Sequence, residues 1–138
     1  MSRGVQDLFA LRDVTLADLS ARLADADLAP DVRYGQMTGL TRVHAPESSP
    51  AIFYFRDGQL AVARLVYPDE HEARQLLGES APELPSSAGK RALVRVRADR
   101  GIAVTEEDDH VVYVEVFPPT TFEDYRDRIH EPPPKFVE

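Results

Sequence analysis

The sequence predicts an α+β protein in which two tandem repeats, each a helix followed by three strands, form one curved antiparallel sheet. We expect helices on one face of this sheet and a further helix at the C-terminus. One observation is Asp57-Gly58 between two apolar runs in 52–68, because a tight hairpin turn favours residues that adopt positive φ. The second is that the pattern returns in 102–118, where Val116-Phe117-Pro118 follows Val66-Tyr67-Pro68 by 50 residues (116 − 66).

Length and composition favour a single domain over residues 1–138. A chain of this length buries roughly two-thirds of its unfolded surface, so it needs no metal or disulfide in order to fold. Hydrophobic residues make up 43% and charged residues 29%, which is typical of a globular protein. Within the domain we expect one repeat over about 15–68, a second over about 69–118, and a C-terminal helix with a proline-rich tail over 119–138.

The first repeat is expected to begin with a helix over 16–26. Thr15 can cap this helix because Asp18 stands three residues on, and apolar residues follow at helical spacing until Pro30. Residues 31–38 are expected to be irregular. The three strands of the repeat are then predicted at 41–44, 51–56 and 59–67, with a polar loop over 45–50.

The second repeat is expected to open with a helix that Asp69 caps, with Glu72 three residues on, and that ends at Gly78. A connection rich in proline and serine follows over 79–90. The alternation of apolar and polar residues after it predicts further strands. These strands are expected at 92–97, 102–105 and 110–117.

The C-terminal segment is predicted to form a third capped helix followed by an extended tail. Thr120 with Glu123 repeats the capping pattern, and the apolar residues that follow keep helical spacing over about ten residues. Three consecutive prolines predict polyproline II for the tail over 130–138.

Composition and charge narrow the classes of function. The absence of cysteine excludes a disulfide framework, a thiol nucleophile and a cysteine zinc site, and it suits a reducing compartment. The net charge of −8 disfavours binding to nucleic acid or to anionic membranes, whereas a protein partner with a basic patch remains compatible. Residues 1–13 lack the apolar core of a signal peptide, and no stretch reaches the ~20 apolar residues of a membrane span. We therefore expect a cytoplasmic protein that binds neither nucleic acid nor membrane.

Leu76-Leu77-Gly78 followed shortly by Pro82, then a strand, a turn and two further strands, resembles the repeat of the β-lactamase inhibitor protein family. The pattern is also similar to the small lipoprotein of the outer-membrane β-barrel assembly machine. The similarity covers 69–118 best and 15–68 more loosely. The chain lacks the lipoprotein cysteine and the paired cysteines of the secreted inhibitor, so these roles are not implied. The resemblance implies a curved sheet with helices on one face, in a group that mostly binds other proteins.

Two clusters of charged residues invite a metal or catalytic interpretation, and each has a simpler one. His71 lies among the acids of 69–72, and His110 follows the acids of 106–109. Acids at the start of a helix stabilise its dipole, and acids at a hairpin tip are solvated, so neither cluster requires a metal. No nucleophile-elbow or phosphate-loop pattern surrounds the serines near Gly89-Lys90. We therefore predict no catalytic residue, no metal site and no cofactor.

Charged residues inside the predicted strands are the candidates for binding. Arg64 interrupts an apolar run and Glu115 interrupts the matching strand, so the two either pair, line a pocket or lie at a solvated edge. Arginines alternate with valines in 92–97 and predict a basic stripe on an exposed sheet face, beside two tyrosines. Aromatic and arginine side chains are enriched at binding hot spots. The predicted binding residues are Tyr54, Arg64, Arg95, Arg97, Tyr113 and Glu115.

These observations favour a non-catalytic module that binds another protein, such as an inhibitor, an immunity protein or an accessory subunit. The alternative is a small-molecule-binding protein or small enzyme with a cleft between the repeats, using Arg64 and His44 or His110. A third hypothesis is a structural subunit whose interface follows a sheet edge. A deep pocket with perturbed titratable groups would favour the second hypothesis over the first. The sequence leaves the identity of the partner and the oligomeric state open.

Overall fold

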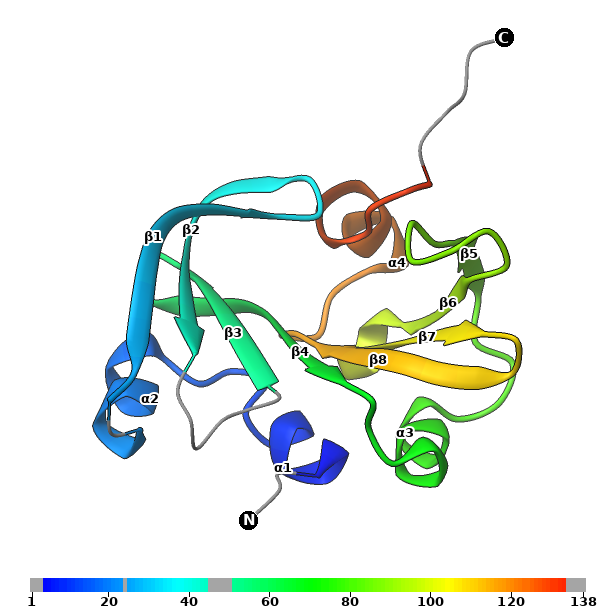
Figure 1. Cartoon of the computed structure of the whole chain (residues 1–138), viewed down its shortest axis with the longest axis horizontal. Coiled ribbons are helices and arrows are strands. Elements are labelled where there is room, and N and C mark those ends of the chain that lie inside the picture. Colours follow the sequence, from blue (N-terminus) through cyan, green and yellow to red (C-terminus); the bar gives the residue numbers. More distant parts are fainter. Residues whose placement is uncertain (1–3, 24, 45–50, 134–138) are drawn as a thin grey trace, which may run out of the picture.

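The computed structural model describes residues 4–23, 25–44 and 51–133, and the fold is α+β with one sheet of eight antiparallel strands (Figure 1). This confirms the predicted class and the antiparallel sheet. The predicted loop over 45–50 and the predicted tail from 134 on lie outside the described residues. The strands pair in the order β1-β2-β3-β4-β8-β7-β6-β5. Their bounds are β1 (Asp27–Tyr34), β2 (Met37–His44), β3 (Ala51–Arg56), β4 (Gln59–Val66), β5 (Glu83–Pro85), β6 (Leu93–Arg97), β7 (Ile102–Glu107) and β8 (His110–Val116).

Each half of the sheet is a run of four consecutive strands, and the halves meet where β4 pairs with β8. The prediction of three strands per repeat is therefore wrong by one strand in each half. Residues 31–38, which we expected to be irregular, belong largely to β1 and β2, and β5 lies inside the predicted connection over 79–90. Duplication of one ancestral unit stays a prediction.

β1 is absent from the sequence-based prediction because Pro30 and Asp31 interrupt its pattern. Asp31 has φ of +60°, and the pairing with β2 shifts register between Ala29 and Val32. A proline is tolerated here because β1 is an edge strand and bonds to a neighbour on one side only. The helix that we predicted to run to residue 26 accordingly ends earlier, as α2 (Leu16–Arg22).

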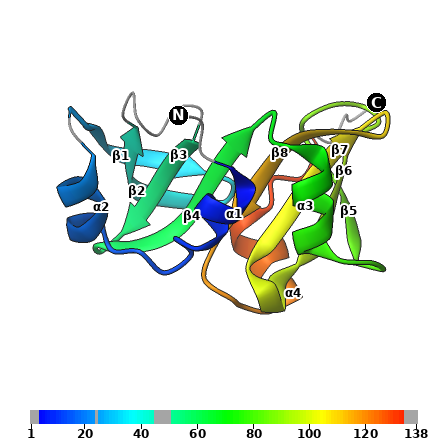
Figure 2. The ribbon, with the colours of Figure 1, turned by 90° about the horizontal axis from the view of Figure 1, so that it is seen from below.

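Helices α1 (Val5–Phe9), α2 and α3 (Glu70–Leu77) pack on one face of the sheet. Figure 2 views this face, with α1 and α3 in front of the strands and α2 at the β1 end. Buried leucines of these helices, among them Leu8, Leu19 and Leu77, join Phe53 and Phe55 of β3 in one apolar core. The alternation of side chains along β3 sends these two rings to this face and Tyr54 to the other.

The predicted caps start the helices, with one shifted by a residue. The side chains of Thr15 and Asp69 each accept a hydrogen bond from the backbone N–H three residues on, at 3.1 and 2.9 Å. At the C-terminal helix the cap is Thr121 rather than Thr120, so this helix begins one residue later than predicted. It comprises α4 (Phe122–Asp124) and the π-helical turn η3 (Tyr125–Ile129). Elsewhere, a 3₁₀ turn, η2 (Ala98–Arg100), links β6 to β7.

The C-terminal helix lies on the opposite face, where the tip of the β1–β2 hairpin bends over to meet it (Figure 1). Gln36 at this tip donates its backbone N–H to the carbonyl of Arg128 at 3.1 Å. Its side-chain amide donates to the carbonyls of Arg126 and His130, at 2.9 and 3.0 Å. Three hydrogen bonds from one residue therefore fasten the hairpin tip to the C-terminal helix.

Gly35 allows this close approach. Its φ is +58°, and a Cβ atom built on it would overlap the carbonyl oxygen of Ile129. The hairpin tip and the C-terminal helix consequently meet above the sheet, and residues of both line a cavity there.

Candidate functional site

Four of the predicted binding residues line one polar cavity on the face that carries the C-terminal helix. Arg64 of β4 is in register with Glu115 of β8, and Val66 is in register with Tyr113. Tyr54 reaches the same cavity from β3, and the volume of the cavity is about 210 Å³. Among the possibilities that the sequence left open for Arg64 and Glu115, the structure therefore shows them lining a pocket.

The sequence-based prediction missed the residues that close this cavity. Tyr34 lines it from the hairpin tip, and Tyr125, Ile129 and His130 line it from the C-terminal helix. Tyr125 is one of the apolar residues at helical spacing in that helix, and it is buried, but its hydroxyl reaches a polar partner. The turn at Gly35 is a visible signal for a hairpin, yet no local pattern indicates that its tip crosses the sheet.

Glu115 joins the two segments that cover the sheet. It is 3% exposed, and its carboxylate accepts hydrogen bonds from the hydroxyls of Tyr34 and Tyr125. Burial raises the pKa of Glu115 above its ordinary value, while the two tyrosine hydroxyls favour the charged form and act against this shift. Burial, and then the charge of Glu115, raise the pKa of Tyr34 and Tyr125, so both hydroxyls keep their protons. Glu115 is therefore a fixed acceptor beneath the hairpin tip and the C-terminal helix.

Arg64 is half-buried and forms no ion pair with its neighbour Glu115. Its guanidinium carbon lies 5.0 Å from the ring centre of Tyr113 and 5.8 Å from that of Tyr34, within the range of cation–π attraction. Burial acts to lower the pKa of Arg64, but the neighbouring tyrosines and Glu115 outweigh it and the net shift is upward. In the described part of the chain, the charged guanidinium has neither a hydrogen bond nor an ion pair.

Arg95 and Arg97 lie on the other face of the sheet, so the expected basic stripe does not lie beside Tyr54 and Tyr113. Neighbouring valines of β6 face the cavity side, and the two arginines point towards α3. Arg97 donates hydrogen bonds to the carbonyls of Leu77, at 3.1 Å, and of Glu79. It thereby provides a donor for carbonyls at and just beyond the C-terminal end of α3. The alternation along β6 was predicted correctly, but the sequence does not say which face of the sheet each set occupies.

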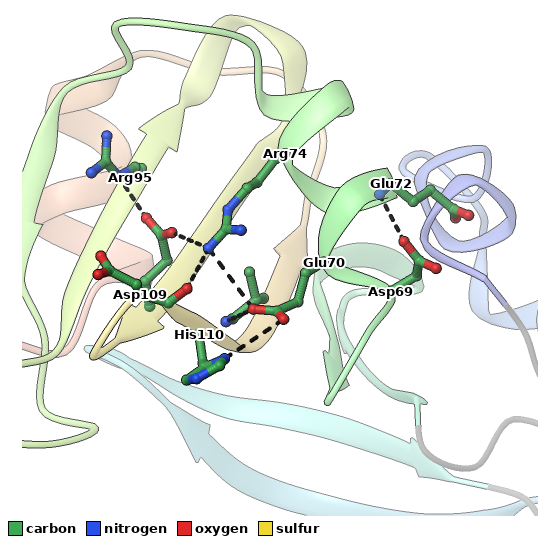
Figure 3. A network of polar contacts seen from close by, with 9 residues as sticks. Asp69, Glu70, Glu72, Arg74, Arg95, Asp109 and His110 are labelled. Carbon is green, nitrogen blue, oxygen red and sulfur yellow. Dashed lines mark hydrogen bonds and ion pairs between the residues drawn. The ribbon is translucent and has the colours of Figure 1, made fainter.

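A network of charged residues covers the sheet beside α3 (Figure 3). Arg74 Nη2 lies 2.8 Å from Glu106 Oε2, and Arg95 Nε lies 2.6 Å from Oε1 of the same carboxylate. Arg74 also donates to the carbonyl of Asp109 at 2.7 Å. An open cavity of about 800 Å³ lies beside these residues. It is larger than the cavity around Arg64, but its arginines already have acceptors, so it offers a ligand no unpaired cation among the described residues.

The acids that invited a metal interpretation bind the backbone and neighbouring side chains. Glu70 accepts a hydrogen bond from the N–H of Val111 at 2.6 Å, and this bond lowers the pKa of Glu70. His110 Nδ1 lies 3.7 Å from the other oxygen of Glu70 (Figure 3). Over the described ranges, no three His, Cys, Asp or Glu side chains converge as the ligands of a metal would.

Comparison of the chain with protein-family models, with curated protein sequences and with solved structures found no match. The resemblance to the β-lactamase inhibitor protein therefore stays a prediction. None of the helices in the described part of the chain is long and apolar enough to cross a membrane.

Proposed function

We propose that this protein is a non-catalytic binding protein whose cavity around Arg64 receives a small ligand through an anionic group, either a carboxylate or a phosphate. One observation carries the proposal. The charged guanidinium of Arg64 is half-buried beside a cavity of about 210 Å³ and has no acceptor among the described residues. This observation favours the small-molecule alternative over the partner protein that the sequence favoured first.

The physical reason is the free-energy cost of a partly buried charge without a partner. A protein avoids this cost by pairing the charge or by leaving it to a ligand. An anion that binds Arg64 gains charge-assisted hydrogen bonds in the fixed geometry of a guanidinium, which two aromatic rings and a strand already hold in place. Less conformational entropy is then lost when the ligand binds.

The size of the cavity limits the ligand. A volume of about 210 Å³ corresponds to roughly seven water molecules at their volume in the liquid. Pockets for drug-sized ligands usually hold about 300–1,000 Å³. We therefore expect a ligand of a few carbon atoms rather than a nucleotide or a peptide.

The titratable groups around the cavity support ligand binding rather than catalysis. Each oxygen of Glu115 accepts one hydrogen bond from a tyrosine hydroxyl, and these bonds favour the charged form, so Glu115 acts as a fixed negative charge rather than as a proton acceptor. The raised pKa values of Tyr34 and Tyr125 keep these hydroxyls protonated, and burial lowers the pKa of His130. A general base would instead need free access to the ligand and a pKa near the working pH.

The test is to titrate the protein with short carboxylates, amino acids and inorganic phosphate. Binding is measured by NMR chemical shifts and by calorimetry. We expect at least one probe to bind the wild type and to lose at least tenfold in affinity with Arg64→Met, which keeps the stem but removes the charge. Arg56→Met is the matched control, because Arg56 is exposed and donates to the carbonyl of Thr38. Binding that survives Arg64→Met, or no binding by any probe, would overturn the proposal.

A protein partner is the second candidate, and Tyr67 favours it. Its side chain is 83% exposed just beyond β4, and its φ of +50° is uncommon for a residue other than glycine. Glu107 and Asp108 line the open hollow beside it, which would suit a partner with a basic patch. A partner captured by the wild type and by Arg64→Met, but lost with Tyr67→Ser, would support this candidate. Equal capture by all three proteins would exclude the surface around Tyr67. A cytoplasmic location suits either candidate and stays a proposal.

A further inference from the structure

Arg64 and Glu115 occupy opposite positions on neighbouring strands, yet other groups hold each of them. The two residues are directly in register between β4 and β8. Residues so placed have Cβ atoms about 5 Å apart, which is close enough for an ion pair. Instead, Arg64 lies over two tyrosine rings, and Glu115 binds two tyrosine hydroxyls. Two opposite charges are thus kept apart within one polar cavity.

We infer that the cavity binds a small zwitterion, a molecule with an ammonium and a carboxylate group on a short carbon chain. The inference rests on the proposed function and adds a second point of recognition to it. The carboxylate of the ligand pairs with Arg64, and its ammonium group approaches Glu115. Both carboxylate oxygens of Glu115 keep a lone pair beyond the one that each tyrosine hydroxyl uses.

The charge balance of the cavity supports this class of ligand. At the rim, Arg33 pairs with Glu131 at 3.0 Å, so their charges cancel. Burial lowers the pKa of His130, which favours its neutral form. Arg64 and Glu115 are therefore the opposing charges that remain for a ligand. A simple anion gains from Arg64 and is repelled by Glu115, and a simple cation meets the reverse. A zwitterion of matching length pairs with both charges. The cavity would therefore select it by attracting both of its ends and by repelling ligands that carry only one charge.

Four tyrosine side chains line the cavity together with the two charged groups. The ring centres of Tyr34 and Tyr54 lie 4.7 Å apart, and Tyr113 lies beneath Arg64. An ammonium group is attracted to such ring faces, particularly where water is excluded. The surface that lines the cavity is mostly polar, which suits a ligand with two charged groups and a short carbon chain.

The experiment compares matched ligands on the wild-type protein by calorimetry and NMR. Each series contains an amino acid, the same chain without its ammonium group and the same chain without its carboxylate. Suitable series are glycine with acetate and methylamine, β-alanine with propionate and ethylamine, and 4-aminobutyrate with butyrate and propylamine. We expect one amino acid to bind at least tenfold more tightly than both of its matched partners. The preferred chain length then measures the separation of the two charges.

Variants assign the two charges to the two ends of the ligand. We expect Arg64→Met to abolish binding of the amino acid. Glu115→Gln keeps the shape of the side chain, and we expect it to reduce the affinity for the amino acid to that for the matched carboxylate. Glu106→Gln is the control, because Glu106 binds Arg74 and Arg95 on the opposite face and its loss should leave the preference unchanged.

The outcomes separate the two proposals. A matched carboxylate that binds as tightly as the amino acid, and that depends on Arg64, would overturn the zwitterion and leave the proposed function intact. Binding of no probe, or binding that survives Arg64→Met, would overturn both. The comparison of ligands uses the wild-type protein, so it decides the inference even if Glu115→Gln does not fold.

Discussion

The two faces of the sheet use arginine and glutamate in opposite ways. Beside α3, Arg74 and Arg95 share the carboxylate of Glu106, and the arginine side chains are 45% and 42% exposed. On the other face, Arg64 and Glu115 stand side by side without pairing, and Glu115 is 3% exposed. The charges near solvent are paired and the buried charges are held apart. The first set stabilises the surface, and the second is the set for which we propose a ligand.

The free energies of the two arrangements differ for the same reason. An exposed ion pair contributes about 0.2–1 kcal/mol, because water competes for both charges. A buried charge costs more to place because it loses water, and the interactions that replace this water then contribute more to stability. Substitutions of the residues around this cavity should therefore change the free energy of unfolding more than substitutions of the network beside α3.

The largest expected effect comes from Glu115→Ala. The substitution leaves the hydroxyls of Tyr34 and Tyr125 without their acceptor and releases both covering segments, so we expect a loss of about 3 kcal/mol or more in the free energy of unfolding. Glu106→Ala breaks two contacts to arginines near solvent and should cost about 1 kcal/mol. Urea denaturation measures both values. Equal losses would remove the distinction between the two faces.

Gly35→Ala tests whether the hairpin tip must lie against the C-terminal helix. A methyl group there overlaps the carbonyl oxygen of Ile129, whereas a Cβ on Gly39 meets nothing within 4 Å. Both glycines have positive φ, so the backbone strain of about 1 kcal/mol is shared and cancels in the comparison. We expect Gly35→Ala to cost about 2 kcal/mol more than Gly39→Ala in urea denaturation. A difference near zero would mean that the tip does not hold this position in solution.

Arg64→Met and Arg95→Met should change stability by different amounts. Arg95 loses ion pairs to Glu83 and Glu106, at 3.6 and 2.6 Å, so we expect a loss of about 0.5–1 kcal/mol. Arg64 has no hydrogen bond or ion pair to lose within the described chain, and the tyrosines and Glu115 that favour its charge offset the cost of its burial, so Arg64→Met should leave stability nearly unchanged. Thermal denaturation at low ionic strength compares the two. A clear loss with Arg64→Met would assign Arg64 a structural role.

The smallest effect concerns pH, and its sign differs between the two faces. Burial raises the pKa of Glu115 above its ordinary value of 4.5, so its contribution to stability is present at low pH and is lost as pH rises through the shifted pKa. The hydrogen bond from Val111 lowers the pKa of Glu70 below 4.5, so its contribution is present above that value and is lost as pH falls.

Measurement of unfolding free energy against pH, for the wild type, Glu115→Gln and Glu70→Gln, checks these signs. The advantage of the wild type over Glu115→Gln should shrink as pH rises above 4.5, and its advantage over Glu70→Gln should shrink as pH falls below 4.5. Parallel curves for the two comparisons would contradict the assignment.

Local patterns determined much of the fold. The hairpin at Asp57-Gly58, the strand alternation around Arg95, and the caps at Thr15 and Asp69 follow from the conformations and hydrogen bonds of a few neighbouring residues. Arg64 and Glu115 stood out because charges inside apolar runs need an explanation wherever the strands lie. These features depend on short stretches of chain, so the sequence alone was sufficient to predict them.

Only the tertiary structure decided the rest, because it depends on contacts between distant parts of the chain. The register of β4 against β8 places Arg64 opposite Glu115, and the face of β6 that meets α3 separates Arg95 from both. The bend of an edge strand brings Tyr34 to a carboxylate 81 residues away. No local sequence pattern encodes these contacts between distant residues. They arise because burying the apolar faces of the sheet leaves each polar side chain only the partners that packing brings within reach.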